Sequence, residues 1–371
     1  MEIKVWDYRK EYEQEREEIW GAIESVLASG TLILGENVTS FEAEFAAFCD
    51  MPHGIGVNSG TDALFLALKA LGVGPGMEVI TVSNTAVPTV AAIEATGARA
   101  RFVDIDPGTF LMNTSELEAA ITPETRLILP VHLYGQCADM DDLLAVAGKH
   151  SLKVLEDCAQ SHGAKFRDNI AGSMGDLSAF SFYPTKILGA YGDGGMLLAK
   201  SEELNAKCRR LRFYGMDTQY YSIEHGYNSR LDEIHAAILR RKLSRLDSYV
   251  SRRREIADIY FRELRDTSLV LPAVDDRNYH SFYVYVVRHR ERDFILESLR
   301  DDGVFLNVSY RWPIHVMPAY EHLGYPLGSL PETERASAEI FSLPMYPSLT
   351  DEEVLIVCEK IKTALDKADQ R

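Results

Sequence analysis

Lys186 stands where an amine could do chemistry. It lies in a short loop between two apolar runs, 179–182 and 196–199, and a glycine-rich turn at 192–195 follows it. A lysine held between buried strands is partly desolvated, which favours the neutral amine that forms a Schiff base with an aldehyde. A solvated loop lysine is the ordinary alternative, so the other motifs must decide.

Two further motifs also follow apolar runs. Asp157 ends the run 153–157, where an unpaired carboxylate is costly. A protonated pyridine nitrogen would be a suitable partner, because a charged nitrogen makes that ring an electron sink, and Gln160 could bond the ring hydroxyl. The turn Asn58-Ser-Gly-Thr61 leads directly into a helical pattern, which is typical of a phosphate-binding helix N-terminus.

Ser181 and Tyr183 complete this set of candidate residues. Ser181 lies five residues before Lys186 and could join the phosphate site, whereas Tyr183 would face the same cleft. A phosphate-binding turn, a strand-end aspartate and a loop lysine thus follow successive strands. Together they indicate a site for pyridoxal 5'-phosphate.

Alternating apolar runs and helical patterns from about residue 53 to 200 predict the elements that position these groups. Such alternation predicts an α/β fold with a mostly parallel sheet, sandwiched by helices. Ligands bind beyond the carboxyl ends of the strands in such sheets. We expect seven strands at 54–57, 78–82, 101–104, 127–131, 153–157, 179–182 and 196–199.

The C-terminal third has a different pattern. Residues 231–265 keep helical periodicity and predict a long connector, and strand-like and helical segments then follow in an α+β arrangement. We therefore expect a large cofactor-binding domain at 1–245, with an N-terminal helical segment, and a small domain at 246–371. The basic cluster Arg252–Arg254, with Arg240, Arg241 and Arg245 upstream, is interpreted first as a solvent-facing helix surface, and a subunit interface is the alternative.

Composition excludes several classes of function. The 371 residues carry a net charge of −17, which argues against a nucleic-acid or anionic membrane partner. The sequence has no signal-peptide pattern and no membrane-spanning stretch, so a cytoplasmic location is expected. The five cysteines form no Cys-x-x-Cys motif and are typical of buried thiols, and no spacing of ligand residues predicts a metal site.

In their order along nearly the whole chain, these motifs resemble the sugar-nucleotide aminotransferases of the DegT–DnrJ–StrS family, which have the aminotransferase fold of type I. The segments that carry the resemblance are 56–64, 130–135, 156–164, 180–186, 192–195, 226–233 and 310–320. One departure is Ala86, where many relatives place an aromatic ring that stacks on the cofactor. Another is Arg311-Trp312, and for this reason no sugar contacts are carried over to that dipeptide.

The resemblance implies roles for individual residues. Lys186 would be the covalent anchor and the general acid and base, Asp157 would pair with the pyridine nitrogen, and Gln160 would contact the ring oxygen. The neighbouring subunit of a homodimer would reach the cofactor phosphate through Asn228, so the active sites would be shared. Further residues implied are Gly60, Thr61 and Ser181 for the phosphate, and Tyr183, Tyr310 and His315 for the substrate.

The implied reaction is transamination with L-glutamate as amino donor and 2-oxoglutarate as product. The acceptor would be a nucleotide-linked 3-keto-6-deoxyhexose, with dTDP as the nucleotide. The product would be a 3-amino-3,6-dideoxy sugar nucleotide for glycan, lipopolysaccharide or natural-product biosynthesis. A 4-keto sugar acceptor remains an alternative, because such enzymes share every catalytic residue, and a catalytically silent regulatory homologue is a more remote one.

Two other readings conflict with single residues. Related sugar dehydratases carry histidine at the lysine position, so Lys186 argues against that chemistry. A dinucleotide-binding oxidoreductase needs Gly-x-Gly-x-x-Gly after its first strand, and the glycines at 54, 56 and 60 have the wrong spacing.

Overall fold

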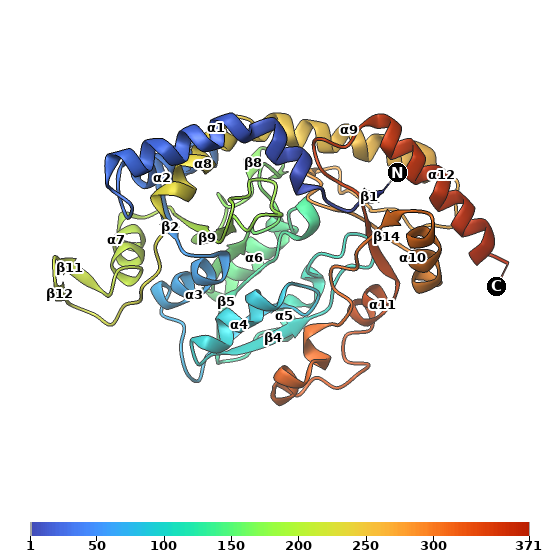
Figure 1. Ribbon diagram of the computed structural model, residues 1–371. Helices are drawn as coiled ribbons and strands as arrows, with labels where there is room; N and C mark the ends of the chain where they lie inside the picture. The colour runs from blue at the N-terminus through green and yellow to red at the C-terminus, as the bar shows by residue number, and fades with distance from the viewer. Residues whose placement is uncertain (1, 371) are drawn as a thin grey trace.

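A seven-stranded sheet forms the centre of the larger part of the molecule in the computed structural model, which describes residues 2–370 (Figure 1). The strands run in the order β2-β10-β9-β6-β5-β3-β4, and β10 alone is antiparallel to its two neighbours. The strand bounds are β2 (His53–Val57), β3 (Glu78–Val82), β4 (Arg99–Val103), β5 (Thr125–Ile128), β6 (Lys153–Asp157), β9 (Leu177–Ser181) and β10 (Gly195–Ala199).

The predicted seven strands and mostly parallel sheet are confirmed, with shifts at the strand ends. The largest shift is in β5, which ends at Ile128 and not at the predicted residue 131. Pro130 has no N–H for a sheet ladder, and Val131 keeps only an isolated bridge to Asp157.

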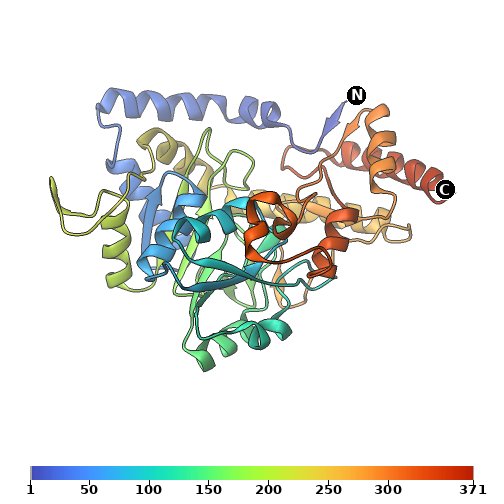
Figure 2. The ribbon, with the colours of Figure 1, turned by 90° about the horizontal axis from the view of Figure 1, so that it is seen from below.

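Helices flank this sheet (Figures 1 and 2). Helix α3 packs against β6, β9 and β10 and lies beside both α4 and α7. It begins at the carboxyl end of β2 because the Ser59 hydroxyl caps it by accepting the Asp62 N–H. The helices of this part are α1 (Tyr8–Ser29), α2 (Glu36–Phe48), α3 (Gly60–Ala70), α4 (Val87–Ala95), α5 (Leu117–Ala120), α6 (Met140–His150), α7 (Glu202–Leu211) and α8 (Glu233–Leu243).

A second hydrophobic core lies in the C-terminal part, on the right in Figure 1. The N-terminus joins this core, because Ile3 is buried in it and β1 (Ile3–Lys4) pairs with β15 (Val304–Phe305) in parallel. The boundary between 245 and 246 stays a prediction. The other elements here are α9 (Leu246–Leu264), α10 (Arg292–Asp301), α12 (Asp351–Ala368), β14 (Tyr285–Arg288) and β16 (Ile340–Leu343).

A lobe built from residues 314–339 packs on the large sheet, although it lies late in the sequence. Ile314, Leu323 and Ala336 belong to the first core. In Figure 1 the helix at 331–339, labelled α11, lies to the right of β4, and the orange remainder of the lobe lies lower. Its elements are the 3-10 turns η3 (Ile314–Val316) and η4 (Pro318–Leu323) and helix α11 (Pro331–Glu339).

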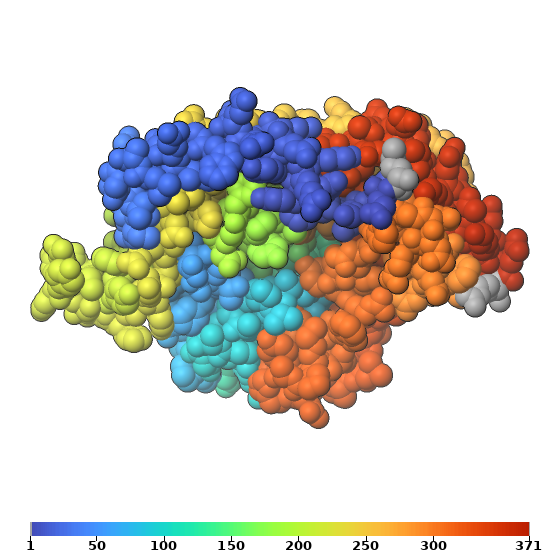
Figure 3. Space-filling view, in the orientation of Figure 1, coloured from blue at the N-terminus to red at the C-terminus, as the bar shows by residue number. Residues whose placement is uncertain are grey.

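The remaining elements are short. A hairpin of β11 (Met216–Thr218) and β12 (Tyr221–Ser222) projects from the body of the chain in Figures 1, 2 and 3, and Tyr220 at its tip is 86% exposed. The others are β7 (Lys165–Phe166), β8 (Asn169–Ile170), β13 (Asn278–Tyr279), η1 (Thr114–Glu116) and η2 (Leu133–Gly135). Within residues 2–370, every helix is too short or too polar to cross a lipid bilayer.

The helical periodicity of residues 231–265 is confirmed for most of its length, as two helices, α8 and α9, with a break at Ser244 and Arg245. One expectation for this region is wrong. The cluster Arg252–Arg254 is not a solvent-facing surface as a whole, because Arg253 is only 3% exposed. Its guanidinium donates to three backbone carbonyls, and these acceptors offset the cost of burying the polar group.

Candidate active site

A cavity of about 250 Å³ opens beyond the carboxyl ends of β6 and β9. Ligands in this class of fold bind beyond the carboxyl ends of the strands. Seven of the residues predicted from the sequence meet in its wall: Gly60, Thr61, Asp157, Gln160, Ser181, Tyr183 and Lys186.

Lys186 reaches this cavity from the loop that follows β9. The loop turns tightly, because the Lys186 N–H donates to the Tyr183 carbonyl over 2.8 Å and the Ala190 N–H donates to the Phe182 carbonyl over 2.8 Å. The Lys186 Nζ lies 4.8 Å from the centre of the Tyr283 ring. The amine is therefore held against an aromatic face at the cavity wall.

Asp157 is the last residue of β6 and is 3% exposed. Its carboxylate accepts a hydrogen bond from the Thr89 hydroxyl over 2.8 Å and from the Ala159 N–H over 3.1 Å. Burial raises the pKa of Asp157, and these two donors and the charge of Lys186 only partly oppose that effect. The cavity therefore holds a carboxylate whose negative charge is incompletely compensated.

The N-terminus of α3 forms the opposite wall of the cavity. Its first intrahelical hydrogen bond runs from the Ala63 N–H to the Ser59 carbonyl, so the N–H groups of Gly60 and Thr61 precede the helical ladder. Ser181 lies so close that a Cβ on Gly60 would stand 2.6 Å from the Ser181 Cβ. This geometry explains the glycine, and it leaves backbone donors and a positive dipole end facing the cavity.

Gln160 is held by two tyrosines. Its carbonyl oxygen accepts the Tyr134 N–H over 3.0 Å, and its amide donates to the Tyr310 hydroxyl. Tyr134 has a φ of 60°, which is strained for a residue with a Cβ, and its ring stacks on Tyr310. Tyr310 therefore contacts the site through Gln160, although it comes from the C-terminal part of the chain.

His315 does not line the cavity. It is 1% exposed, and its ring nitrogens are 2.8 Å from the Ser83 hydroxyl and 3.1 Å from a Glu334 oxygen. The Ser83 contact fastens the 314–339 lobe to the carboxyl end of β3, and the Glu334 contact lies within the lobe. A substrate contact by His315 stays a prediction that this geometry does not favour.

Asn228 is exposed and lies outside the cavity wall of its own chain. The next residue, Ser229, donates its hydroxyl to Asp62 over 2.7 Å and accepts the Asn58 N–H over 3.1 Å. Asn228 is thereby fixed beside the turn that precedes α3. A contact with the cofactor of a neighbouring subunit stays a prediction.

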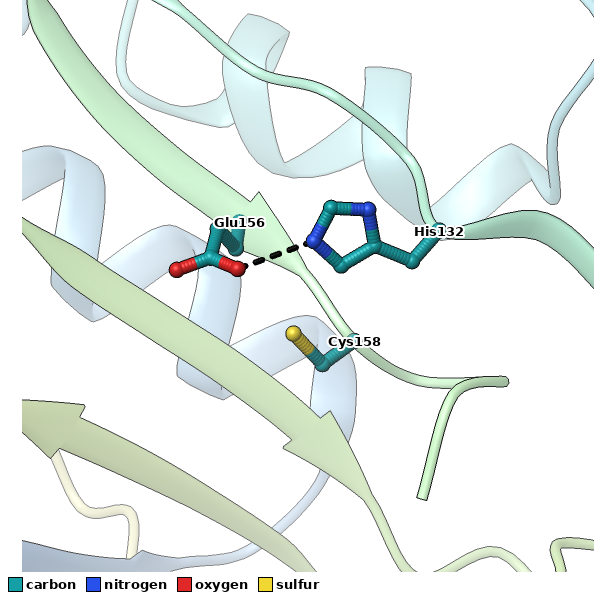
Figure 4. A group of neighbouring side chains, drawn as sticks. All are labelled: His132, Glu156 and Cys158. Atoms are coloured by element: carbon teal, nitrogen blue, oxygen red, sulfur yellow. Dashed lines mark hydrogen bonds and ion pairs between the residues drawn. The ribbon is translucent and has the colours of Figure 1, made fainter. Parts of the chain in front are cut away.

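A second buried group lies at the end of β6, around Glu156 (Figure 4). His132, Glu156 and Cys158 have the residue types of a metal site, but the first two are engaged within the protein. His132 Nδ1 accepts the Ala138 N–H, so its proton is on Nε2, which donates to Glu156 over 2.9 Å. Glu156 also accepts three backbone N–H groups, at 172, 174 and 175. The group is therefore best explained as a structural network.

Sequence reasoning missed three residues near the reacting groups. Thr85 and Thr89 line the cavity, and Thr89 hydrogen-bonds Asp157. The only signal in the sequence was the spacing of the two threonines, four residues apart at the start of a helix. Tyr283 contacts Lys186 and donates to or accepts from the Thr185 hydroxyl over 3.1 Å. Nothing local to Tyr283 in the sequence predicts that contact.

A loop lysine, a buried strand-end carboxylate and a helix N-terminus around one cavity define an enzyme of the α/β class that binds an anionic carbonyl cofactor. The chain belongs to the DegT/DnrJ/EryC1/StrS aminotransferase family, whose sequence profile matches residues 13–362. The expected family is thus confirmed, and the protein is an aminotransferase.

Two similar proteins show how far this likeness extends. The chain is 54% identical over 355 residues to a dTDP-3-amino-3,4,6-trideoxy-alpha-D-glucose transaminase of Micromonospora megalomicea subsp. nigra, covering 94% of this chain and 95% of that protein. It is 44% identical to a pleiotropic regulatory protein of Geobacillus stearothermophilus, covering 97% and 98%.

Solved structures confirm the expected fold. The crystal structure of DesV from S. venezuelae in complex with a ketimine intermediate superimposes with a TM-score of 0.96 at 41% identity, covering 98% of each chain. The structure of NtdA from Bacillus subtilis with bound cofactor PMP gives a TM-score of 0.89 at 32% identity, covering 95% of this chain and 82% of that one.

Proposed function

We propose that this protein is a pyridoxal 5'-phosphate-dependent aminotransferase that acts on a dTDP-linked 3-keto-6-deoxyhexose. L-glutamate is the amino donor, and the products are 2-oxoglutarate and a 3-amino sugar nucleotide. The proposal depends above all on one observation, the cavity in which Lys186 and the under-compensated Asp157 carboxylate meet. The transaminase name of the 54% identical relative supports the choice of a 3-keto sugar linked to dTDP.

The residues of the cavity fit the cofactor at two ends. A cationic ring nitrogen beside Asp157 would supply the positive charge that two hydrogen-bond donors do not provide. At the other end, the close approach of Gly60 and Ser181 leaves backbone donors at a helix N-terminus for a phosphate group. The donor set therefore matches a ligand that carries a cation and a dianion on one ring.

The chain's own residues perform the proton transfers and the positioning. Pyridoxal 5'-phosphate, when bound, supplies an electron-withdrawing ring that accepts the electron pair left when a substrate carbon loses its proton. The Lys186 amine takes that proton from the α-carbon of the amino donor and later returns a proton to the sugar carbon. Asp157 keeps the ring nitrogen charged, and Gly60, Thr61 and Ser181 hold the phosphate.

We also propose a cytoplasmic homodimer with shared active sites. The exposed Asn228 lies beside the turn that leads into α3, as expected of a residue that serves a neighbouring subunit. The five buried free cysteines suit a reducing compartment. Sedimentation analysis and mixing of Asn228→Ala with Lys186→Ala subunits test this: restored activity in the mixed dimer supports a shared site.

The visible absorption spectrum of the purified protein, before and after L-glutamate, tests the proposed chemistry. A yellow band that fades with L-glutamate is expected, and the keto sugar that restores it identifies the acceptor. Lys186→Ala should lose turnover entirely and keep its fold. Turnover in that variant, or no band after the cofactor is supplied, would contradict the proposal.

A 4-keto sugar acceptor and a regulatory role remain the alternatives. The regulatory name of the 44% identical relative is the observation that favours the second, whereas the intact cavity with Lys186 favours catalysis. Supplying matched 3-keto and 4-keto sugars separates the two acceptors. A protein that binds the cofactor but turns over neither sugar would favour regulation.

A further inference from the structure

We propose that Tyr283 is a positioning residue for Lys186, and that the face of its ring holds the lysine amine whenever that amine is not covalently bound. This inference rests on the proposed function, because it concerns how the reacting amine is held between proton transfers. Tyr283 lies about one hundred residues after Lys186 and outside the motifs that carry the family likeness.

Two contacts join Tyr283 to the lysine loop. The Lys186 Nζ lies 4.8 Å from the centre of the Tyr283 ring, within the range of a cation–π interaction. The Tyr283 hydroxyl is 3.1 Å from the hydroxyl of Thr185, the residue next to the lysine. The ring thus contacts the charged end of Lys186, while the hydroxyl fixes the backbone from which the lysine extends.

Tyr283 is itself held rigidly from the far side. The buried Arg253 of α9 donates to the carbonyls of both Phe282 and Tyr283, over 3.3 and 3.0 Å. Phe282 has a φ of 47°, a strained conformation that the surrounding packing must impose. The His280 ring stacks on Phe282 with ring centres 3.9 Å apart, and its Nδ1 accepts the Phe282 N–H over 2.9 Å.

The same segment also packs on the loop that holds Gln160. A Cβ on Gly135 would stand 2.8 Å from the Tyr283 nitrogen, and the Ser281 N–H donates to the Gly135 carbonyl over 2.8 Å. Tyr283 therefore contacts three parts of the chain: the loop of Lys186, the segment at Gly135 next to the Tyr134 that bonds Gln160, and helix α9. A tyrosine whose backbone is fixed by two elements, and whose hydroxyl contacts a third, can hold a flexible lysine side chain in one place.

This arrangement has a chemical consequence. An aromatic face attracts the lysine amine and limits the positions that the amine can adopt. The amine that has just taken a proton would then stay at the cavity wall instead of moving to solvent. Loss of the ring should slow the proton transfers and leave substrate binding nearly unchanged.

The experiment compares Tyr283→Phe, which keeps the ring, with Tyr283→Leu, which removes it. In Tyr283→Leu we expect kcat to fall about 3- to 30-fold, the factor that corresponds to a cation–π contact, with KM for L-glutamate changed less than about 2-fold. Tyr283→Phe should stay within about 3-fold of the unchanged protein. Thr185→Val removes the same hydroxyl contact from the other side and should match Tyr283→Phe.

A second measurement does not depend on turnover. The cofactor-free protein is treated with an amine-acylating reagent near neutral pH, and labelling of Lys186 is followed by mass spectrometry. Labelling should be about 3- to 30-fold faster in Tyr283→Leu, because the ring no longer covers the amine and holds it at the cavity wall. Since no sugar or donor is present, this result stands whether or not the proposed reaction is correct.

Tyr279→Leu is the matched control. Its ring lies 4.1 Å from the Arg254 guanidinium carbon, so the variant removes a cation–π contact of the same kind outside the cavity. It should change Lys186 labelling less than about 2-fold. Unchanged labelling and unchanged kcat in Tyr283→Leu would overturn the proposal, as would a Tyr283→Phe variant that is impaired as severely as Tyr283→Leu.

Discussion

Two neighbouring carboxylates at the end of β6, Glu156 and Asp157, are both buried but differ in the number of hydrogen bonds that they accept. Glu156 is 0% exposed and accepts hydrogen bonds from the His132 ring and from three backbone N–H groups. Asp157 is 3% exposed and accepts only two, one of them from Thr89. Successive strand residues point to opposite faces, so the two carboxylates meet different neighbours.

Their pKa values move in opposite directions for this reason. Burial alone raises the pKa of both carboxyl groups. For Glu156 the hydrogen bond from His132, with those from the backbone N–H groups, outweighs burial and lowers the pKa below its ordinary value. For Asp157 burial dominates, and the pKa is raised. The structural carboxylate, Glu156, is thus the one whose negative charge is balanced by hydrogen-bond donors. Asp157, whose charge is not fully balanced, is the one that faces a ligand cavity.

The largest expected effect is on catalysis by Asp157→Asn. Asparagine keeps the shape and can still accept the Ala159 N–H, but it cannot hold a ring nitrogen in the charged state. We expect the rate at which L-glutamate bleaches the visible band to fall about 10³-fold. A fall smaller than about tenfold would mean that Asp157 does not play the proposed part.

The same variant should behave in the opposite way in the cofactor-free protein. Removing an under-compensated buried charge should raise the thermal unfolding midpoint, by about 1 to 3 °C for a chain of this size. Bound cofactor should reverse the order of the two proteins. A lower midpoint for cofactor-free Asp157→Asn would contradict the claim that the Asp157 charge is incompletely balanced in the absence of the cofactor.

The next effect is on stability, in Glu156→Gln. Its amide would direct hydrogens at groups that are themselves donors, so we expect a loss of about 3 kcal/mol in the free energy of unfolding. Activity per folded molecule should change less than about 3-fold, because Glu156 is absent from the cavity wall. The measurement is urea unfolding alongside the bleaching rate.

Glu94→Gln is a matched control for that prediction. Glu94 also pairs with a histidine, His322, over 2.8 Å, but the His322 side chain is 55% exposed. Exposed pairs contribute little, so the control should lose less than about 1 kcal/mol. Equal losses in the two variants would show that burial is not what distinguishes Glu156.

The third prediction concerns how the free energy of unfolding changes at acid pH. The stabilisation by Glu156 is present above its unfolded pKa, near 4.5, and is lost as pH falls through the lower folded value. Asp157 has a raised folded pKa, so its destabilisation is absent below the unfolded value, near 3.8, grows as pH rises above it, and is complete above the raised folded value. In urea unfolding of the cofactor-free proteins, the two variants should converge on the unchanged protein from opposite sides. Asp157→Asn should do so as the pH falls to about 3.8, the ordinary aspartate value, and Glu156→Gln as the pH falls from about 4.5 through the lower folded value.

The sequence predicted the strand-end residues because their positions follow from local periodicity and one general rule. Short apolar runs fix where strands end, and parallel strands bring their carboxyl ends to one edge of the sheet. Lys186, Asp157 and Gly60 could therefore be placed together without any knowledge of strand order. The strand order itself, and the reversed direction of β10, depend on packing that no local pattern records.

Long-range contacts explain what the sequence did not predict. Tyr283 meets Lys186 only because Arg253 and Gly135 fix its backbone from distant elements. His315 looked like a substrate residue by likeness alone, whereas its two ring nitrogens are used by Ser83 and Glu334. The pairing of β1 with β15 likewise joins the N-terminal segment to residues 304 and 305 of the C-terminal part through a contact without any sequence periodicity.

The smallest expected effect comes from removing one of the two hydrogen bonds that the Asp157 carboxylate accepts. Thr89→Val removes one of the two hydrogen bonds to the carboxylate and keeps the shape of the side chain. We expect the bleaching rate to fall about 3- to 10-fold, the cost of one hydrogen bond, and Thr89→Ser should recover most of the lost rate.

Thr85→Val is the control, because Thr85 contacts Thr89 over 2.9 Å and not Asp157. The bleaching rate of this control should fall less than about 3-fold. If Thr89→Val matched the unchanged protein, the orientation of Asp157 would depend on the Ala159 N–H alone, and the Thr89 hydroxyl would have no part in placing the charge.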